Sequence, residues 1–391
     1  MFSDRTQWSL QPNRLAELLQ QRSDRRPYDD LTESNPTRCG FEFDEPAILT
    51  ALSQPQVLCY QPEPRGLLSA REAVAAYYAA RGERVDPQRI FLTSSTSEAY
   101  SYIFRLMANP GDQILAPRPS YPLFDLLGRL NDVTLVDYPL VYHDRWQIDP
   151  LTFSRRITPR SRGVLVVTPN NPTGSFLSSH DRAMALEHCA RYGVAMIADE
   201  VFADFILEAG SAGTPSRLAD VGEALTFTLN GLSKICALPQ MKVAWLVVNG
   251  PKALADEAVK RLDIIADTYL SVSTPAALAL PALLASRHLI QRQILERLWV
   301  NLQQLDAALW PQSTVSRLKV EGGWYAVLRV PNVRSDEQWA LDLLEYNDVL
   351  VHPGHFFDFA SEGFLVVSLL PQPLVFAGAM VRTLDFIHRN S

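Results

Sequence analysis

The chain is poor in cysteine and lysine, lacks long apolar runs and has no cluster of basic residues, and each shortage argues against a class of protein. The four cysteines are scattered without C-x-x-C spacing, so we expect neither a disulfide scaffold nor a metal centre and favour a reducing cytoplasm. No segment approaches the about 20 apolar residues of a membrane span, and the polar segment 1–30 lacks the apolar core of a signal peptide. With a formal net charge of −7, nucleic acid is not expected as a partner.

What the chain does contain is an alternation of apolar, strand-like segments with helical ones, typical of a mainly parallel sheet covered by helices. The strands expected in this sheet are residues 89–93, 113–116, 133–138, 163–168, 194–198, 226–229 and 243–248. A helical segment from 275 to about 310, interrupted near Pro281, leads to a smaller α+β region with strands expected at 325–330, 349–352 and 365–369. The length of 391 residues also indicates two domains.

One of only five lysines, Lys234, directly follows an expected strand, within Gly231-Leu232-Ser233-Lys234. An amine at the end of a buried strand is desolvated, which lowers its pKa and makes it nucleophilic toward an aldehyde. The ordinary alternative is a solvated surface lysine. In open α/β sheets, ligands bind where strands end. Other expected strands end at polar or aromatic groups, namely Ser95, Thr96, Ser97, Tyr121, Asn171 and Asp199.

These residues offer a partner for each part of pyridoxal 5′-phosphate (PLP). A carboxylate such as Asp199 keeps the pyridine nitrogen protonated, and the Asn171 amide can donate to the phenolic oxygen. The segment Ser95-Thr96-Ser97 offers hydroxyls and helix-start amides to the phosphate, with Lys242 as the cation. Tyr121 can stack on the ring. Taken singly, each has a simpler explanation: a helix cap, a turn, or a tyrosine of the core.

In combination, the chain resembles the fold-type I PLP aminotransferases of class I/II from about Thr32 to its end. The matching residues are Tyr60, Gly66, Arg71-Glu72, Asn170-Asn171-Pro172-Thr173-Gly174, Asp199-Glu200, Ser233-Lys234 with Pro239, and His352-Pro353-Gly354 with Phe357. The resemblance implies an α/β fold with a seven-stranded, mainly parallel sheet in the large domain. It implies a PLP Schiff base on Lys234, and a homodimer in which Tyr60 reaches the partner's phosphate. The expected division is an N-terminal arm, 1–45, that belongs to the small domain, a large domain, 46–275, and the remaining small domain with its bridging helix, 276–391.

Three positions depart from the family pattern. Phe202 stands where the family often has a tyrosine that donates to the phenolic oxygen, and Lys242 replaces the phosphate-binding arginine. Val366 replaces the arginine that commonly holds the substrate carboxylate. A carboxylate in a dry site still needs a cation or several donors. We therefore nominate Arg38 as the substitute, with Arg118 as the second candidate.

The resemblance implies transamination between an α-amino acid and a 2-oxo acid, with Lys234 moving the proton of the substrate Cα. Because Val366 removes the usual carboxylate anchor, a β-elimination lyase or a cyclase on the same fold is an open alternative. A PLP-binding regulator without catalysis is a third, although the retained Lys234, Asp199 and Asn171 argue against it.

Overall fold

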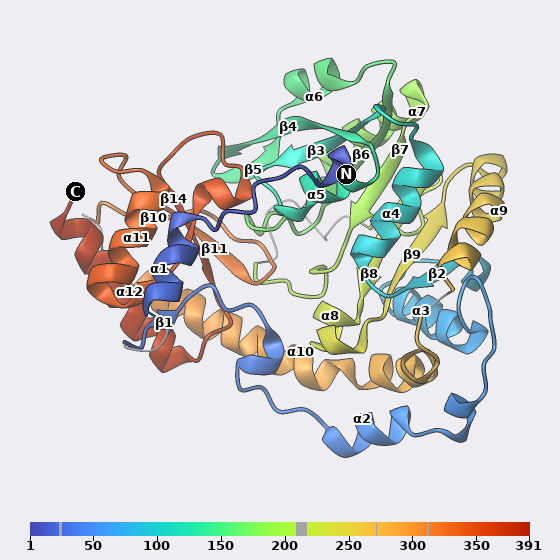
Figure 1. The fold of residues 1–391 in the computed structure, drawn as a ribbon, viewed down its shortest axis with the longest axis horizontal. Helices are drawn as coiled ribbons and strands as arrows, with labels where there is room; N and C mark the ends of the chain where they lie inside the picture. Colours follow the sequence, from blue (N-terminus) through green and yellow to red (C-terminus); the bar gives the residue numbers. More distant parts are fainter. Residues whose placement is uncertain (23–25, 209–216, 271, 311–312) are drawn as a thin grey trace.

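The computed structural model describes residues 1–22, 26–208, 217–270, 272–310 and 313–391, and its centre is an eight-stranded sheet (Figure 1). The strands, in spatial order, are β2 (Ile90–Thr93), β9 (Ala244–Asn249), β8 (Thr226–Gly231), β7 (Ala195–Asp199), β6 (Ser161–Val167), β3 (Gln113–Arg118), β4 (Thr134–His143) and β5 (Arg145–Ile148). The run from β8 to β4 is parallel, whereas β9 is antiparallel to both of its neighbours. The predicted α/β fold with a mainly parallel sheet is therefore confirmed, and each expected strand is present.

The eighth strand, β5, was missed by the sequence analysis. It forms an antiparallel hairpin with β4, and it turns at Asp144, which has a positive φ of 58°. Trp146 and Ile148 are buried while the alternate residues are half-buried. Alternation over only four residues is too short a signal to separate from a loop.

Helices cover both faces of the sheet. One face packs against α4 (Thr96–Met107), α5 (Leu123–Leu130) and α9 (Lys252–Tyr269). The other packs against α3 (Leu68–Ala80), α6 (Pro150–Arg156), α7 (Ser179–Tyr192) and part of α10. The central strands are largely apolar because both of their faces are buried; β6, for example, sends Leu165 to one face and Val164 to the other.

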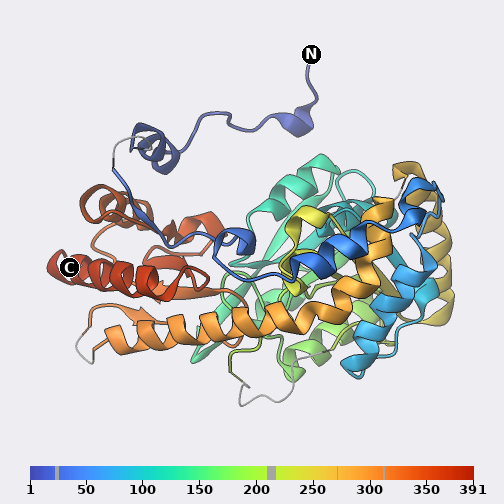
Figure 2. The ribbon, with the colours of Figure 1, turned by 90° about the horizontal axis from the view of Figure 1, so that it is seen from below.

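The helix α10 (Thr274–Ala308) is a single 35-residue element, and the predicted interruption near Pro281 is wrong. It runs from α2 (Glu45–Leu52) and α3 on the large domain to α12 (Pro373–Arg389) on the small domain (Figure 2). A proline removes one helical hydrogen bond. Here Leu280, Leu283 and Leu284, on either side of it, are buried against the large domain, and this packing keeps the helix continuous.

The small domain holds a four-stranded sheet in the order β10 (Ser316–Arg317), β11 (Tyr325–Arg329), β14 (Phe364–Ser368) and β13 (His352–Pro353). The expected strand 349–352 is split into β12 (Val349–Leu350) and β13, and β12 pairs with β1 (Asp29–Asp30) from the N-terminal segment. The other helices are α1 (Arg14–Arg22), α8 (Leu232–Ile235) and α11 (Asp336–Asn347). None of the helices in the described part of the chain is long and apolar enough to cross a membrane.

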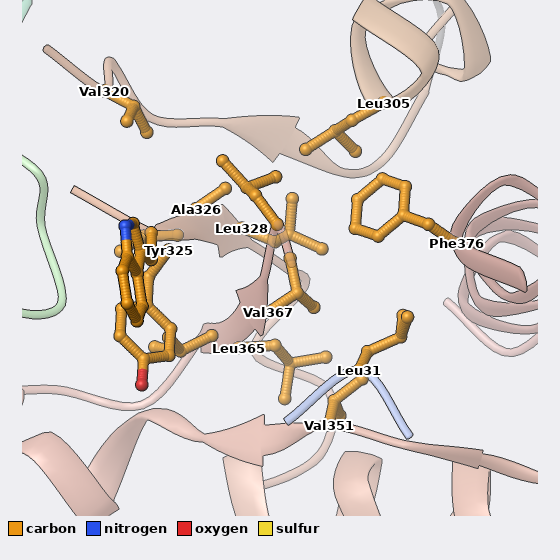
Figure 3. Close-up of a cluster of buried hydrophobic side chains, with 14 of the residues drawn as sticks. Leu31, Leu305, Val320, Tyr325, Ala326, Leu328, Val351, Leu365, Val367 and Phe376 are labelled. Atoms are coloured by element: carbon orange, nitrogen blue, oxygen red, sulfur yellow. The ribbon is translucent and has the colours of Figure 1, made fainter. Parts of the chain in front are cut away.

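The apolar core of the small domain joins distant parts of the sequence (Figure 3). Leu31 from the N-terminal segment, Leu305 from α10 and Phe376 from α12 converge on Leu365 and Val367 of β14. The proposed domain division places 1–45 with this domain, and the position of Leu31 supports that part. The division at 275/276 falls in the first turn of α10. This helix packs against α2 and α3 of the large domain and against α12 of the small domain, so it belongs to both.

Candidate active site

The register of the large sheet gathers most of the predicted site residues at one edge. Thr93, which precedes the Ser94–Ser97 run, lies opposite Ala244, and Ala244 also lies opposite Gly231, so Lys242 and Lys234 extend from neighbouring strands. Asp199 lies opposite Leu229 on one side and Val167 on the other. Thr93, Asp199 and Gly231 each end their strands, and Leu229 is only two residues before Gly231, so chemically different side chains converge at this end of the sheet.

Lys234 lies in α8, the short helix after β8, and is half-buried. Its Nζ is 4.6 Å from the ring centroid of Trp324 and 5.2 Å from that of Phe202. Burial lowers the pKa of Lys234 to about 8, and the nearby Asp199 carboxylate opposes this shift. A substantial fraction of this amine is therefore neutral, and hence nucleophilic, near pH 8.

Asp199 is buried at the end of β7 with both carboxylate oxygens engaged. Oδ2 accepts a 2.8 Å hydrogen bond from the Tyr100 hydroxyl, and Oδ1 accepts one of 3.1 Å from the Val201 N–H. Burial raises the pKa of Asp199, while these hydrogen bonds and the Lys234 charge oppose the rise. Tyr100, on α4, was missed by the sequence analysis because a buried tyrosine on a helix looks like a core residue.

Asn171 is buried, and its Oδ1 has no hydrogen-bond partner among the described residues. The preceding Asn170 holds the loop instead: its Oδ1 accepts from the Thr173 hydroxyl at 2.8 Å. Tyr121 keeps 38% exposure, and its pKa is raised by burial and by the Asp199 charge. Asn171 therefore keeps a buried amide oxygen unsatisfied, and Tyr121 lies near enough to Asp199 to feel its charge.

The helix start assigned to the phosphate is already partly capped. The Ser95 hydroxyl accepts a 3.1 Å hydrogen bond from the Glu98 N–H, the ordinary N-cap role. Thr96 and Ser97 are half-buried in the first turn, and Ser233 is half-buried in α8. Lys242 is exposed in this single chain. An anion at this end of α4 benefits from the helix dipole and from free amides.

The two arginines nominated for the substrate carboxylate differ in their surroundings. The Arg38 side chain, on a short 3₁₀ turn (Pro36–Arg38), is 74% exposed, and its nearest acid is Glu33 at 3.7 Å. Arg118 is 14% exposed and ion-paired with three carboxylates, those of Asp125, Asp137 and Asp358. Val366 is fully buried, paired with Val327 and His352. Arg38 is thus the freer donor of the two.

The residues present suit PLP. The buried carboxylate of Asp199, the buried side-chain amide of Asn171, whose N–H group is a donor, and the Lys234 amine with its lowered pKa are the kinds of group that the pyridine nitrogen, the phenolic oxygen and the aldehyde need. Tyr60, which the resemblance assigns to a partner's site, is 70% exposed. Within the described ranges, no group of three or more His, Cys, Asp or Glu side chains is placed to hold a metal ion.

Comparison with known proteins decides the family. A family model described as "Aminotransferase class I and II" matches residues 39–372. The chain belongs to the class I and II aminotransferases. This aminotransferase is 28% identical to glutamate-pyruvate aminotransferase AlaA of Escherichia coli K12, over 87% of this chain and 85% of that protein. It is also 28% identical to the alanine aminotransferase of Mycobacterium tuberculosis, over 91% and 85% of the two chains.

Solved structures support the same fold. An aminotransferase from Escherichia coli superposes with a TM-score of 0.86 at 24% identity, covering 99% of this aminotransferase and 98% of that chain. Alanine aminotransferase from Pyrococcus furiosus gives a TM-score of 0.83 at 24% identity, over 96% and 95% of the chains. The chain is therefore a PLP-dependent enzyme that transfers an amino group between an amino acid and a 2-oxo acid.

Proposed function

We propose that this enzyme exchanges amino groups between alanine or glutamate and the matching 2-oxo acids, with Lys234 as the reacting lysine. The placement of the Lys234 amine, near Asp199 and with a pKa of about 8, carries the proposal at the level of the site. The names of two relatives, glutamate-pyruvate and alanine aminotransferase, support the choice of substrates. The test is a screen of single amino acids for conversion of the enzyme's absorbance to the pyridoxamine form. Alanine or glutamate should give the fastest conversion, and no conversion by either would refute the substrate assignment.

Each side chain has one task in this proposal. PLP, when bound, supplies an electron sink that makes the substrate Cα proton acidic. The Lys234 amine would take that proton from the substrate Cα and deliver it to C4′, the aldehyde carbon of the cofactor. Asp199, its carboxylate fixed by Tyr100 and Val201, keeps a proton on the pyridine nitrogen. The side-chain amide N–H of Asn171 would donate a hydrogen bond to the phenolic oxygen, and Tyr121 would cover the ring.

The phosphate and the substrate carboxylate use the remaining residues. Thr96, Ser97 and Ser233 offer hydroxyls beside the α4 amides, and Lys242 supplies the positive charge. We assign the substrate carboxylate to Arg38, because its guanidinium is largely exposed whereas that of Arg118 is held by three carboxylates.

A homodimer completes the site in this proposal. The 70% exposure of Tyr60 and the exposure of Lys242 leave both side chains available to a second copy of the chain. An isologous two-fold contact then uses each Tyr60 in the partner's site. We also propose a cytoplasmic location, which the four free cysteines, three of them buried, support.

A second candidate is β-elimination. The chain is 26% identical to the S-alkyl-thiohydroximate lyase SUR1 of Arabidopsis thaliana, over 79% of this chain and 69% of that protein. Val366, at the position of the family's carboxylate anchor, also favours substrates bound in another way. Incubation with an S-alkyl cysteine separates the two functions. A lyase consumes water and releases pyruvate, ammonia and a thiol with no 2-oxo acid added, whereas a transaminase needs an added 2-oxo acid as acceptor for turnover.

A further inference from the structure

Trp324 is a small-domain residue whose ring lies against the reacting lysine of the large domain. It is fully buried and directly precedes β11. Its backbone carbonyl accepts a 2.8 Å hydrogen bond from the Leu369 N–H, just after β14. The rings of Phe202 and Phe205 meet it edge-on at centroid distances of 5.3 and 5.2 Å. The indole is therefore packed by residues of both domains, while its N–H has no hydrogen-bond partner among the described residues.

The Lys234 amine faces aromatic rings rather than a carboxylate. The structure gives its Nζ no hydrogen bond and no ion pair within the described residues; the Trp324 ring centroid, at 4.6 Å, is closer than that of Phe202, at 5.2 Å. Asp199 is the charged group that acts on it. Tyr100 and Tyr121, which face Asp199, are neutral phenols because burial raises their pKa. No hydroxyl is present at position 202 to share the task of holding the amine.

We propose that Trp324 is a positioning residue: its indole face holds the protonated amine of Lys234 whenever that amine is not bonded to the cofactor. An ammonium over an indole ring is attracted by the ring quadrupole, indole attracts more strongly than phenyl, and the attraction grows when water is excluded. The inference rests on the proposed role of Lys234 and extends it to the other domain.

The consequence is a direct link between the position of the small domain and the charge of the reacting lysine. Burial alone favours the neutral amine, and the indole face favours the protonated one. A shift of the small domain that removes Trp324 from Lys234 leaves the desolvation and takes away the stabilising face. The neutral, proton-accepting form then becomes more abundant at a given pH.

The test measures the pKa of Lys234 in the full chain loaded with pyridoxamine 5′-phosphate, the cofactor form that leaves the lysine free. Trace acetic anhydride is added across a pH series, and acetylation of the Lys234 peptide is quantified by mass spectrometry. Trp324→Leu keeps an apolar wall but removes the π face, so the midpoint should fall by about 0.5 to 1.5 pH units. In Trp324→Phe the midpoint should fall by less, because a phenyl ring attracts an ammonium less strongly than an indole ring does. An unchanged or raised midpoint in Trp324→Leu overturns the proposal.

The matched control is Trp339→Leu. Trp339 is also a fully buried small-domain tryptophan, but its indole N–H donates to the Pro331 carbonyl at 3.0 Å, and its ring contacts Phe386. Its loss should leave the Lys234 midpoint unchanged. If Trp324→Leu does not fold, Trp324→Phe alone decides: a midpoint equal to that of the wild type refutes the contact. Borohydride mapping of the wild type tests separately whether Lys234 carries the cofactor, so the failure of one assignment is distinguishable from that of the other.

Discussion

The Tyr100 hydroxyl donates a 2.8 Å hydrogen bond to Oδ2 of Asp199, and both residues are buried. Tyr100 belongs to α4, the helix whose first turn we assign to the cofactor phosphate, while Asp199 ends β7. One helix thus contributes both to the phosphate end and to the carboxylate proposed for the pyridine nitrogen. With Oδ1 held by the Val201 N–H, the carboxylate is oriented by the protein itself.

The first prediction concerns this hydrogen bond. Tyr100→Phe removes a donor that lowers the pKa of Asp199, so that pKa should rise. A raised carboxyl pKa means that the charge is lost earlier as the pH falls, so the acidic limb of the kcat profile should move to higher pH. Tyr138→Phe is the control, since that buried hydroxyl donates to the Leu165 carbonyl instead. Superimposable profiles for Tyr100→Phe and the wild type would contradict the role.

The second prediction concerns the carboxylate charge. Asp199→Asn keeps the size and the buried position but removes the negative charge, so kcat should fall by roughly 100-fold or more, as when a preorganised electrostatic partner is lost. Circular dichroism should show an unchanged fold. Asp181→Asn, at a buried aspartate in the first turn of α7, should retain near-normal turnover. Near-normal turnover in Asp199→Asn would count against the assignment.

The third prediction identifies the reacting lysine. Borohydride reduction of the holoenzyme followed by peptide mapping should find the cofactor on Lys234, whose pKa is lowered to about 8 by burial. Lys242 is the informative alternative because it lies nearby but is exposed. Lys242→Arg should retain the label on Lys234, and a label on Lys242 in the wild type would refute the site.

The sequence predicts the strands and the residues at their ends well because both depend on local patterns. Asp199 follows a continuous apolar run, and Lys234, one of only five lysines, directly follows a strand. Tyr100 and Trp324 escape prediction for the opposite reason. Tyr100 contributes through its contact with Asp199, and Trp324 through its contact with Lys234. Each contact joins residues about 90 or more positions apart in the sequence. Neither contact leaves a periodic trace. The continuity of α10 through Pro281 cannot be predicted from the sequence for the same reason, because it depends on packing against α3.

The fourth prediction tests the dimer. If Tyr60 serves the partner's site, Lys234→Ala and Tyr60→Ala chains complement each other, since one of the two sites in a mixed dimer has both residues intact. Equal mixing and refolding should restore about a quarter of wild-type sites, because about half of the dimers are mixed and half of their sites are complete. Sedimentation should show a dimer throughout. Failure of the mixture to exceed the activity of the separate variants would place Tyr60 in its own chain's site or outside any site.

The last prediction concerns the substrate carboxylate. Val366 is buried against Val327 and His352 and offers no charge, so a cation or several neutral donors must come from other residues. The guanidinium of Arg38 is largely exposed and has one acid at 3.7 Å. The guanidinium of Arg118 is already paired with three carboxylates of the chain. Arg38→Ala should therefore raise the amino-acid KM by about 10- to 100-fold, with PLP affinity unchanged.

The matched variants separate binding from folding in that experiment. Arg38→Lys keeps the charge but loses the bidentate fork, so its KM should lie between those of the wild type and Arg38→Ala. Arg118→Ala releases Asp125, Asp137 and Asp358 from their common partner. It should therefore lower the melting temperature while KM stays nearly constant. If KM rises in Arg118→Ala at unchanged stability and stays constant in Arg38→Ala, the anchor is Arg118. If neither variant changes KM, the carboxylate is held by neutral donors.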